Sequence, residues 1–96
     1  MGLGIHVRDL RREEIRSLTD SPDDSFRRMC QSAPWESLRR GVMQHGTTVF
    51  NSLQLYRFIE ELEALPPAET TATVREVLDA AQLALRHSGY LEFVGD

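Results

Sequence analysis

The residues that could do covalent or metal chemistry in this chain are few and scattered. One cysteine, Cys30, and three histidines, His6, His45 and His87, supply its only thiol and imidazole groups. A metal site needs ligands at usable spacing, such as two histidines one helical turn apart or paired cysteines. None of these four residues has such a partner in the sequence, so we expect no metal site and no cofactor.

Cys30 could act as a nucleophile only beside a base and an oxyanion-binding pocket. It follows Phe26 and Met29 at helical spacing, which is more typical of a small core residue. The chain also lacks a GxSxG elbow, a Walker glycine loop and a GxGxxG motif, so acyl transfer and nucleotide chemistry lose their usual support. We assign no catalytic residue, and a small enzyme that uses Cys30 with a histidine is the third of our hypotheses.

Charged residues offer two further possibilities. The acids Glu60, Glu61 and Glu63 crowd one predicted helix, but a glycosidase-like pair needs carboxylates that converge across a cleft, so a solvated face or an acidic patch for a basic partner is the better interpretation.

A basic patch is the alternative, and its candidates are Arg11, Arg12, Arg27, Arg28, Arg39 and Arg40. They could bind nucleic acid or another phosphate-bearing ligand. Acids interleave with these arginines, which favours local ion pairing and makes nucleic acid the less favoured partner. Trp35 and Arg39, four residues apart, could form an exposed stacking pair or a core-edge indole under a cation.

The sequence predicts that these residues belong to one small acidic domain, residues 1–96, whose helices and strands position them. The composition is 41% hydrophobic and 27% charged, which is ordinary for a globular chain. Residues 1–57 carry a net charge of +2 and residues 58–96 a net charge of −6, which together give the −4 of the chain. We expect no membrane segment, no secretory signal and no internal disulfide, and hence a cytoplasmic protein that is a monomer or a homodimer.

The first half of the sequence predicts one strand and short helices. Leu3, Ile5 and Val7 alternate with polar residues or glycine, as in a half-buried strand. Asp9 is a suitable cap for a short helix that reaches about Leu18. After a turn-rich loop over 19–24, further short helices are expected over 25–31 and from Pro34 to about Val42.

The second half gives sharper patterns. A strand over 47–50 precedes Asn51 and Gln54, which are spaced as a capping box. Leu55, Phe58, Ile59, Leu62 and Leu65 then form one apolar stripe of a helix that Pro66 and Pro67 end. A second amphipathic helix begins near Thr71, Gly89 suits a left-handed C-cap, and Tyr90–Val94 alternate as a strand. The predicted fold is α+β, with a small three-stranded sheet, two main amphipathic helices and one or two short N-terminal helices.

Three blocks of the sequence resemble a group of short, uncharacterised bacterial proteins. The blocks are Thr48-Val-Phe-Asn51 with Gln54, the helix Phe58–Leu65, and Tyr90-Leu-Glu-Phe-Val-Gly-Asp96, and the resemblance covers roughly residues 46–96. It carries no established activity. It implies that a shared site, if one exists, involves Thr48, Asn51, Gln54, Glu61, Tyr90, Gly95 and Asp96.

The leading hypothesis is a non-enzymatic protein–protein interaction module, of the kind that acts as an accessory or immunity protein by binding and masking a partner. It rests on small size, acidity, the one-sided charge split and the lack of an assembled catalytic set. The candidate partner-binding residues are Thr48, Asn51, Gln54, Glu61, Tyr90 and Asp96.

Overall fold

A computed structural model describes residues 2–95 of the chain. The helices and strands follow one another as β1 (Gly4–Arg8), β2 (Glu14–Thr19), α1 (Ser25–Gln31), a 3-10 turn η1 (Arg39–Gly41), β3 (Gly46–Phe50), α2 (Ser52–Glu63), a second 3-10 turn η2 (Pro67–Glu69), α3 (Ala72–Arg86) and β4 (Tyr90–Gly95). The α+β class is therefore confirmed.

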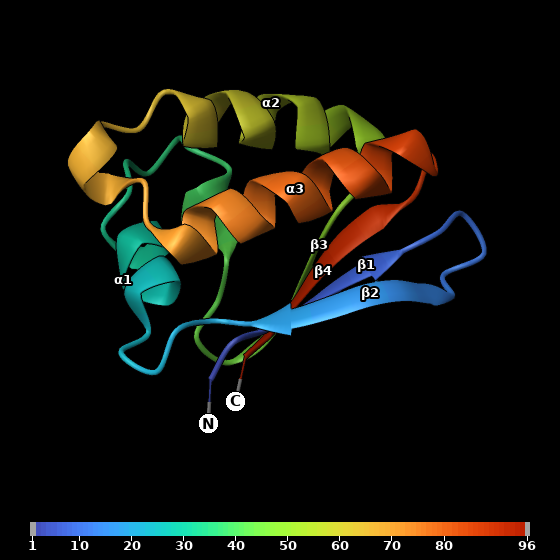
Figure 1. Cartoon of the computed structure of the whole chain (residues 1–96), viewed down its shortest axis with the longest axis horizontal. Helices are drawn as coiled ribbons and strands as arrows, with labels where there is room; N and C mark the ends of the chain where they lie inside the picture. The colour runs from blue at the N-terminus through green and yellow to red at the C-terminus, as the bar shows by residue number, and fades with distance from the viewer. Residues whose placement is uncertain (1, 96) are drawn as a thin grey trace.

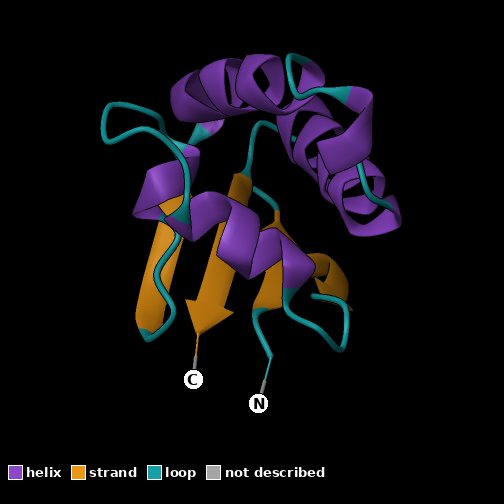
Figure 2. Ribbon diagram, turned by 90° about the vertical axis from the view of Figure 1, so that its left-hand side faces the viewer, coloured by secondary structure: helices purple, strands orange, loops and turns teal. Residues whose placement is uncertain are grey.

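The strands form one antiparallel sheet in the order β2-β1-β4-β3. The two termini supply its central strands, because β4 pairs with β1 on one side and with β3 on the other. All three α-helices cover the same face of the sheet, and the other face is open (Figure 1, Figure 2). This layering explains the period of two in β1 and β4, since one side of each strand packs under the helices.

The core lies between the sheet and the helices. From the sheet, Ile5, Val7, Leu91 and Phe93 contribute fully buried side chains. From the helices come the predicted stripe of α2 and the inner side of α3, which includes Val74, Val77, Ala81 and Ala84. Phe93 packs against three other rings at centroid separations of 5.6–6.0 Å, and these rings belong to Phe26, Phe50 and Phe58.

The predicted three-stranded sheet is wrong, because the sheet has four strands. The missing strand is β2, which occupies the second half of the segment predicted as a helix from Asp9 to Leu18. The Asp9 carboxylate does accept hydrogen bonds from backbone amides. The donors are Arg11 and Glu13, and the contacts close a tight turn instead of starting a helix. Arg12 takes the left-handed conformation at φ 68°, which reverses the chain and lets β2 pair back onto β1.

The region from Pro34 to Val42 also differs from the prediction. Instead of a continuous helix, it holds a turn and the three-residue η1. The helix over 25–31 is confirmed as α1. Two backbone amides in its first turn are capped by a residue outside the helix. The buried carboxylate of Asp20 accepts hydrogen bonds from the amides of Phe26 at 3.0 Å and Arg27 at 2.8 Å.

Candidate functional site

Three of the predicted partner-binding residues hold the start of α2 and the loop before β3. Asn51 and Gln54 form the predicted capping box, with each side chain accepting from the other residue's backbone amide at 3.0 and 2.9 Å. The Thr48 hydroxyl donates to the carbonyl of Gly41 at 2.9 Å and lies 3.4 Å from the amide of Met43. These contacts give all three side chains structural roles.

Glu61 fastens the loop that precedes η1 to α2. Its carboxylate accepts from the backbone amides of Leu38 at 2.7 Å and Arg39 at 3.1 Å, and from the Arg39 guanidinium at 3.3 Å. Only 14% of the Glu61 side chain is exposed. The carboxylate is therefore a fixed anchor within the fold rather than a free acid.

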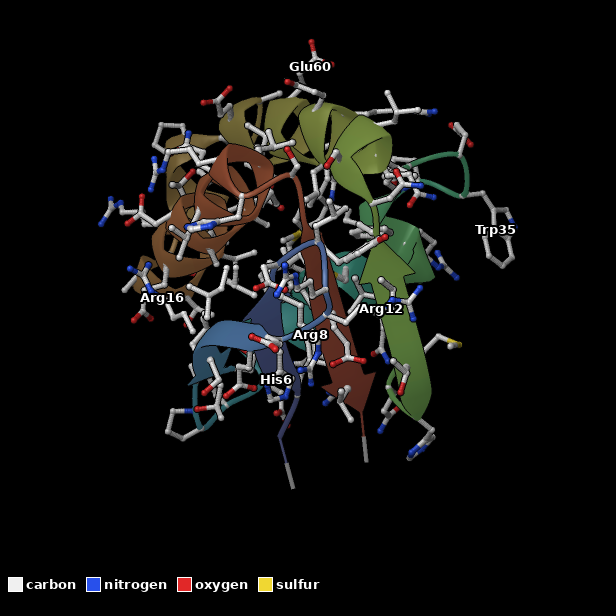
Figure 3. The ribbon with its side chains drawn as sticks, turned by 90° about the vertical axis from the view of Figure 1, so that its right-hand side faces the viewer. His6, Arg8, Arg12, Arg16, Trp35 and Glu60 are labelled. Atoms are coloured by element: carbon white, nitrogen blue, oxygen red, sulfur yellow. The ribbon has the colours of Figure 1, made fainter. Side chains whose placement is uncertain are left out.

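Tyr90 lies on the open face of the sheet, where its ring is covered by the guanidinium of Arg12 at 5.2 Å from the centroid. Beside it, Arg8 is paired with Glu92 at 2.8 Å and His6 with Glu14 at 2.6 Å (Figure 3). These pairs link β1 to both of its neighbouring strands, β2 and β4.

The predicted set does not converge on one cleft. Thr48 is the middle residue of β3, Asn51 and Gln54 lie at the start of α2, Glu61 is on the last turns of α2, and Tyr90 begins β4. Gly95 is required for close packing, because a Cβ there would lie 2.1 Å from the carbonyl oxygen of Gln44. Asp96 falls outside the described residues.

The candidate basic patch is divided in the same way. Arg11 and Arg12 belong to the β1–β2 turn, Arg27 and Arg28 to α1, and Arg39 and Arg40 to η1. Most of these arginines engage neighbours within the chain: Arg27 pairs with Asp24, Arg28 lies 3.9 Å from Asp23, Arg39 binds Glu61, and Arg40 donates to the carbonyl of Ala33.

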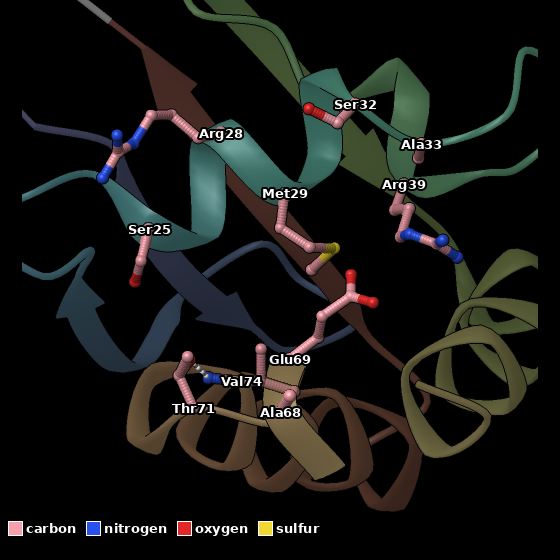
Figure 4. A pocket seen from close by; sticks show the side chains of 10 residues that line it. All are labelled: Ser25, Arg28, Met29, Ser32, Ala33, Arg39, Ala68, Glu69, Thr71 and Val74. Atoms are coloured by element: carbon pink, nitrogen blue, oxygen red, sulfur yellow. Dashed lines mark hydrogen bonds between the residues drawn. The ribbon is translucent and has the colours of Figure 1, made fainter. Parts of the chain in front are cut away.

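Arg28 and Arg39 line the same cavity, which has a volume of about 510 Å³ and lies between α1 and the start of α3 (Figure 4). The carboxylate of Glu69 turns toward the Arg39 side chain there, whereas the Arg28 guanidinium points away from both. Buried Nε of Arg39 has no hydrogen-bond partner among the described residues. With one acid facing an arginine already bound to Glu61, the cavity does not have the single-sign charge that a phosphate site would need.

Cys30 is fully buried in the core. Its burial raises the pKa of the thiol well above the ordinary value, so the protonated form persists where a nucleophile would need the thiolate. This geometry gives the Cys30 enzyme hypothesis no support.

A different feature stands out on the surface. Trp35 is 80% exposed, although a buried or half-buried indole is the common case. Its ring is covered by the guanidinium of Arg40 at 4.3 Å from the centroid, not by Arg39 as the spacing suggested.

The loop that carries Trp35 is held in place on both sides of the indole. Arg57 of α2 donates to the carbonyl of Glu36 at 3.0 Å, and the Ser37 hydroxyl donates to the carbonyl of Pro34 at 2.6 Å. The next two residues, Leu38 and Arg39, donate their backbone amides to Glu61. Trp35 is therefore displayed on an ordered loop, and Figure 3 shows it projecting from the body of the molecule.

The outer side of α2 also exposes large apolar side chains. Leu53 is 82% exposed and Tyr56 is 63% exposed. They lie one turn apart on the side of the helix away from the buried stripe. Arg57, which holds the Trp35 loop, lies one turn after Leu53 on the same side. We call Trp35, Leu53 and Tyr56 the apolar rim.

Of these three residues, only Trp35 is among the candidates drawn from the sequence; Leu53 and Tyr56 are not. The available signal was their spacing, because two large apolar residues outside the stripe of an amphipathic helix have no core to enter. Their exposure would follow from the helical phase alone.

Comparison of the chain with protein-family models, with curated proteins and with solved structures finds no significant match. Within residues 2–95, no helix is long and apolar enough to cross a bilayer. The same residues contain no group of three or more histidine, cysteine or acidic side chains arranged to hold a metal ion.

Proposed function

We propose that this protein is a non-enzymatic binding module that masks a partner protein through the apolar rim. The observation that carries the proposal is Trp35, a large aromatic side chain that is 80% exposed on a loop fastened by hydrogen bonds. Tryptophan is enriched among the residues that dominate binding energy. An ordered loop adds to affinity because little conformational entropy is lost on association.

The charge around the rim indicates what kind of partner fits. Residues 58–96 contain eight acids against two arginines, and half of these acids, Glu60, Glu63, Glu76 and Asp79, are exposed on α2 and α3. Glu60 stands on the outermost side of α2 (Figure 3). A partner with an apolar contact area bordered by basic side chains would complement this surface, and the opposite charges would speed association.

The test is affinity capture from the native host with the unaltered chain and with matched variants. Trp35→Ala and Leu53→Ala are expected to lose a partner that the unaltered chain retains. For the purified pair, we expect Trp35→Ala to weaken binding by roughly 30-fold or more, as for a residue that dominates an interface. The matched control is Leu10→Ala, which removes the same side chain as Leu53→Ala from a position that is 65% exposed at the β1–β2 turn.

Three results would count against the proposal. The first is that Leu10→Ala and Trp35→Ala weaken capture equally, because the rim would then have no special part. The second is that no protein is retained specifically. The third is that the unaltered chain binds single-stranded DNA or RNA at low salt, with affinity that falls steeply as salt rises, because this is the behaviour of the arginine hypothesis.

A further inference from the structure

The two edges of the sheet are built differently. The β2 edge carries Glu14 and Arg16, and its pairing with β1 shifts register between Val7 and Arg8. Charged side chains and bulges are the usual devices that keep a sheet edge from pairing with another chain. The β3 edge, with the sequence Gly-Thr-Thr-Val-Phe, contains no charge, no proline and no such irregularity.

The outer backbone of β3 is also uncovered. Its residues Gly46–Phe50 pair with β4 on one side, and no backbone hydrogen bond joins them to another part of residues 2–95 on the other side. The neighbouring loop is hydrogen-bonded to the Thr48 side chain rather than to the backbone of β3. Gly46, Thr47 and Val49 are exposed. Backbone donors and acceptors in this state form a template for a further strand.

We propose that the protein forms a two-fold symmetric dimer in which β3 pairs antiparallel with β3 of a second copy and continues the sheet across the interface. The symmetric register places Thr48 opposite Thr48 of the second copy. Thr47 then lies opposite Val49, and Gly46 lies opposite Phe50. The four-stranded sheets become one sheet of twice that size.

The sequence of β3 suits a second copy, because the side chains that face each other in an antiparallel pair of identical β3 strands fit together. In this register, β-branched Thr47 and Val49 meet on the open face, where such cross-strand pairs are favourable. On the inner face, the largest side chain, Phe50, meets the residue without a side chain, Gly46. No like charges are brought together in this register, because β3 contains no charged residue.

The surface around β3 adds apolar contact area. Met43 is 47% exposed, and its methyl group lies 3.4 Å from the Cβ position of Gly46. Trp35 projects on the β3 side of the molecule (Figure 3). Five paired residues and these flanks amount to less than a standard interface, so we expect a dissociation constant in the range of about 1–100 µM.

Sedimentation velocity of the full chain across about 1–500 µM, a range chosen to bracket that affinity, tests the dimer. The double variant Thr47→Lys/Val49→Lys places like charges directly opposite each other twice in the proposed register, and we expect it to weaken dimerisation by at least about tenfold. The matched control, Ser17→Lys/Thr19→Lys, adds the same charge to exposed positions of the other edge strand and should leave the dimer unchanged.

Disulfide trapping tests the register itself. Thr47→Cys/Val49→Cys should form covalent dimers under mild oxidation, because opposed residues of an antiparallel pair lie within disulfide range. Ser17→Cys/Thr19→Cys should not. A chain that stays monomeric throughout the concentration range overturns the proposal, as does a dimer insensitive to the lysines at positions 47 and 49. The proposed partner function is judged separately, by variants at positions 35 and 53.

Discussion

Glu61 shows how one carboxylate can organise a surface at a distance from the core. It holds the backbone of Leu38 and Arg39 as well as the Arg39 guanidinium, and these contacts fix the loop that displays Trp35. We expect Glu61→Ala to lower the free energy of unfolding by about 2–4 kcal/mol, because two amides and a buried guanidinium lose their acceptor. Urea denaturation measures this.

The comparison that isolates the role of Glu61 is Glu60→Ala on the same helix. The Glu60 side chain is exposed and should contribute almost nothing to stability. If the two variants unfolded at the same urea concentration, the loop would not depend on Glu61, and the ordered display of Trp35 would need another cause.

Cys30 makes stability sensitive to alkaline pH. Burial raises the pKa of its thiol in the folded state, whereas the unfolded thiol ionises near its ordinary value of about 8.5. Below that value both states are protonated and the thiol has no pH effect. Above it only the unfolded state loses the proton, so the free energy of unfolding falls by up to about 1.4 kcal/mol per pH unit.

Cys30→Ala should remove this part of the alkaline decrease, although it lowers stability at neutral pH by creating a cavity. Denaturation at a series of pH values between about 7 and 10, on either side of the ordinary thiol pKa, separates the two effects. Parallel curves for the two chains would show that the thiol ionises equally in the folded and unfolded states.

At the scale of elements, the end of α3 illustrates a part of the fold that composition could not give. Gly89 was predicted as the left-handed cap, but Ser88 takes that conformation, at φ 52°. Gly89 donates to the carbonyl of Ala84 at 2.8 Å and Ser88 to that of Leu85 at 3.0 Å, which is a Schellman motif. Gly89 is needed for space instead, because a Cβ there would lie 1.9 Å from the carbonyl oxygen of Arg8.

Ser88→Gly should therefore stabilise the protein, by about 1 kcal/mol, because glycine adopts the left-handed conformation without the steric cost that serine bears. Thermal or urea denaturation measures the gain. Ser88→Ala is the control, since it removes the hydroxyl and keeps the strained backbone. An equal gain from alanine would mean that the hydroxyl, rather than the backbone, is responsible.

The elements that the sequence predicted correctly are those whose pattern reflects burial. The stripe of α2 and the alternation of β1 and β4 each record one side packed against the core. The sequence of β2 shows no such pattern of burial, because five of its six residues are exposed. Its strand conformation comes from pairing with β1, a tertiary contact that overrides the helical preference of its charged residues.

At the scale of the whole molecule, the surfaces could be predicted less well than the core. Most of the predicted partner-binding residues have contacts that explain them within the fold, such as the capping box of Asn51 and Gln54. The apolar rim joins a loop at Trp35 to α2 at Leu53, and the open edge of β3 depends on strand order. The apolar rim and the open β3 edge both depend on which elements lie side by side in the fold. No local pattern of residues in the sequence predicts that arrangement.

The same topology makes the C-terminal segment essential. β4 lies between β1 and β3 and pairs with both, and Leu91 and Phe93 are fully buried at the centre of the aromatic cluster. Deleting residues 91–96 would leave β3 without a neighbour and open the core. We expect the truncated chain to lose the amide-exchange protection of β1, α2 and α3 together rather than fray at one end.

A graded variant keeps this prediction testable if the truncated chain cannot be obtained. Phe93→Ala should cost about 3–5 kcal/mol, and Val94→Ala, on the partly exposed side of the same strand, should cost much less. A truncated chain that kept its slow-exchanging amides would show that β1 and the helices fold without β4.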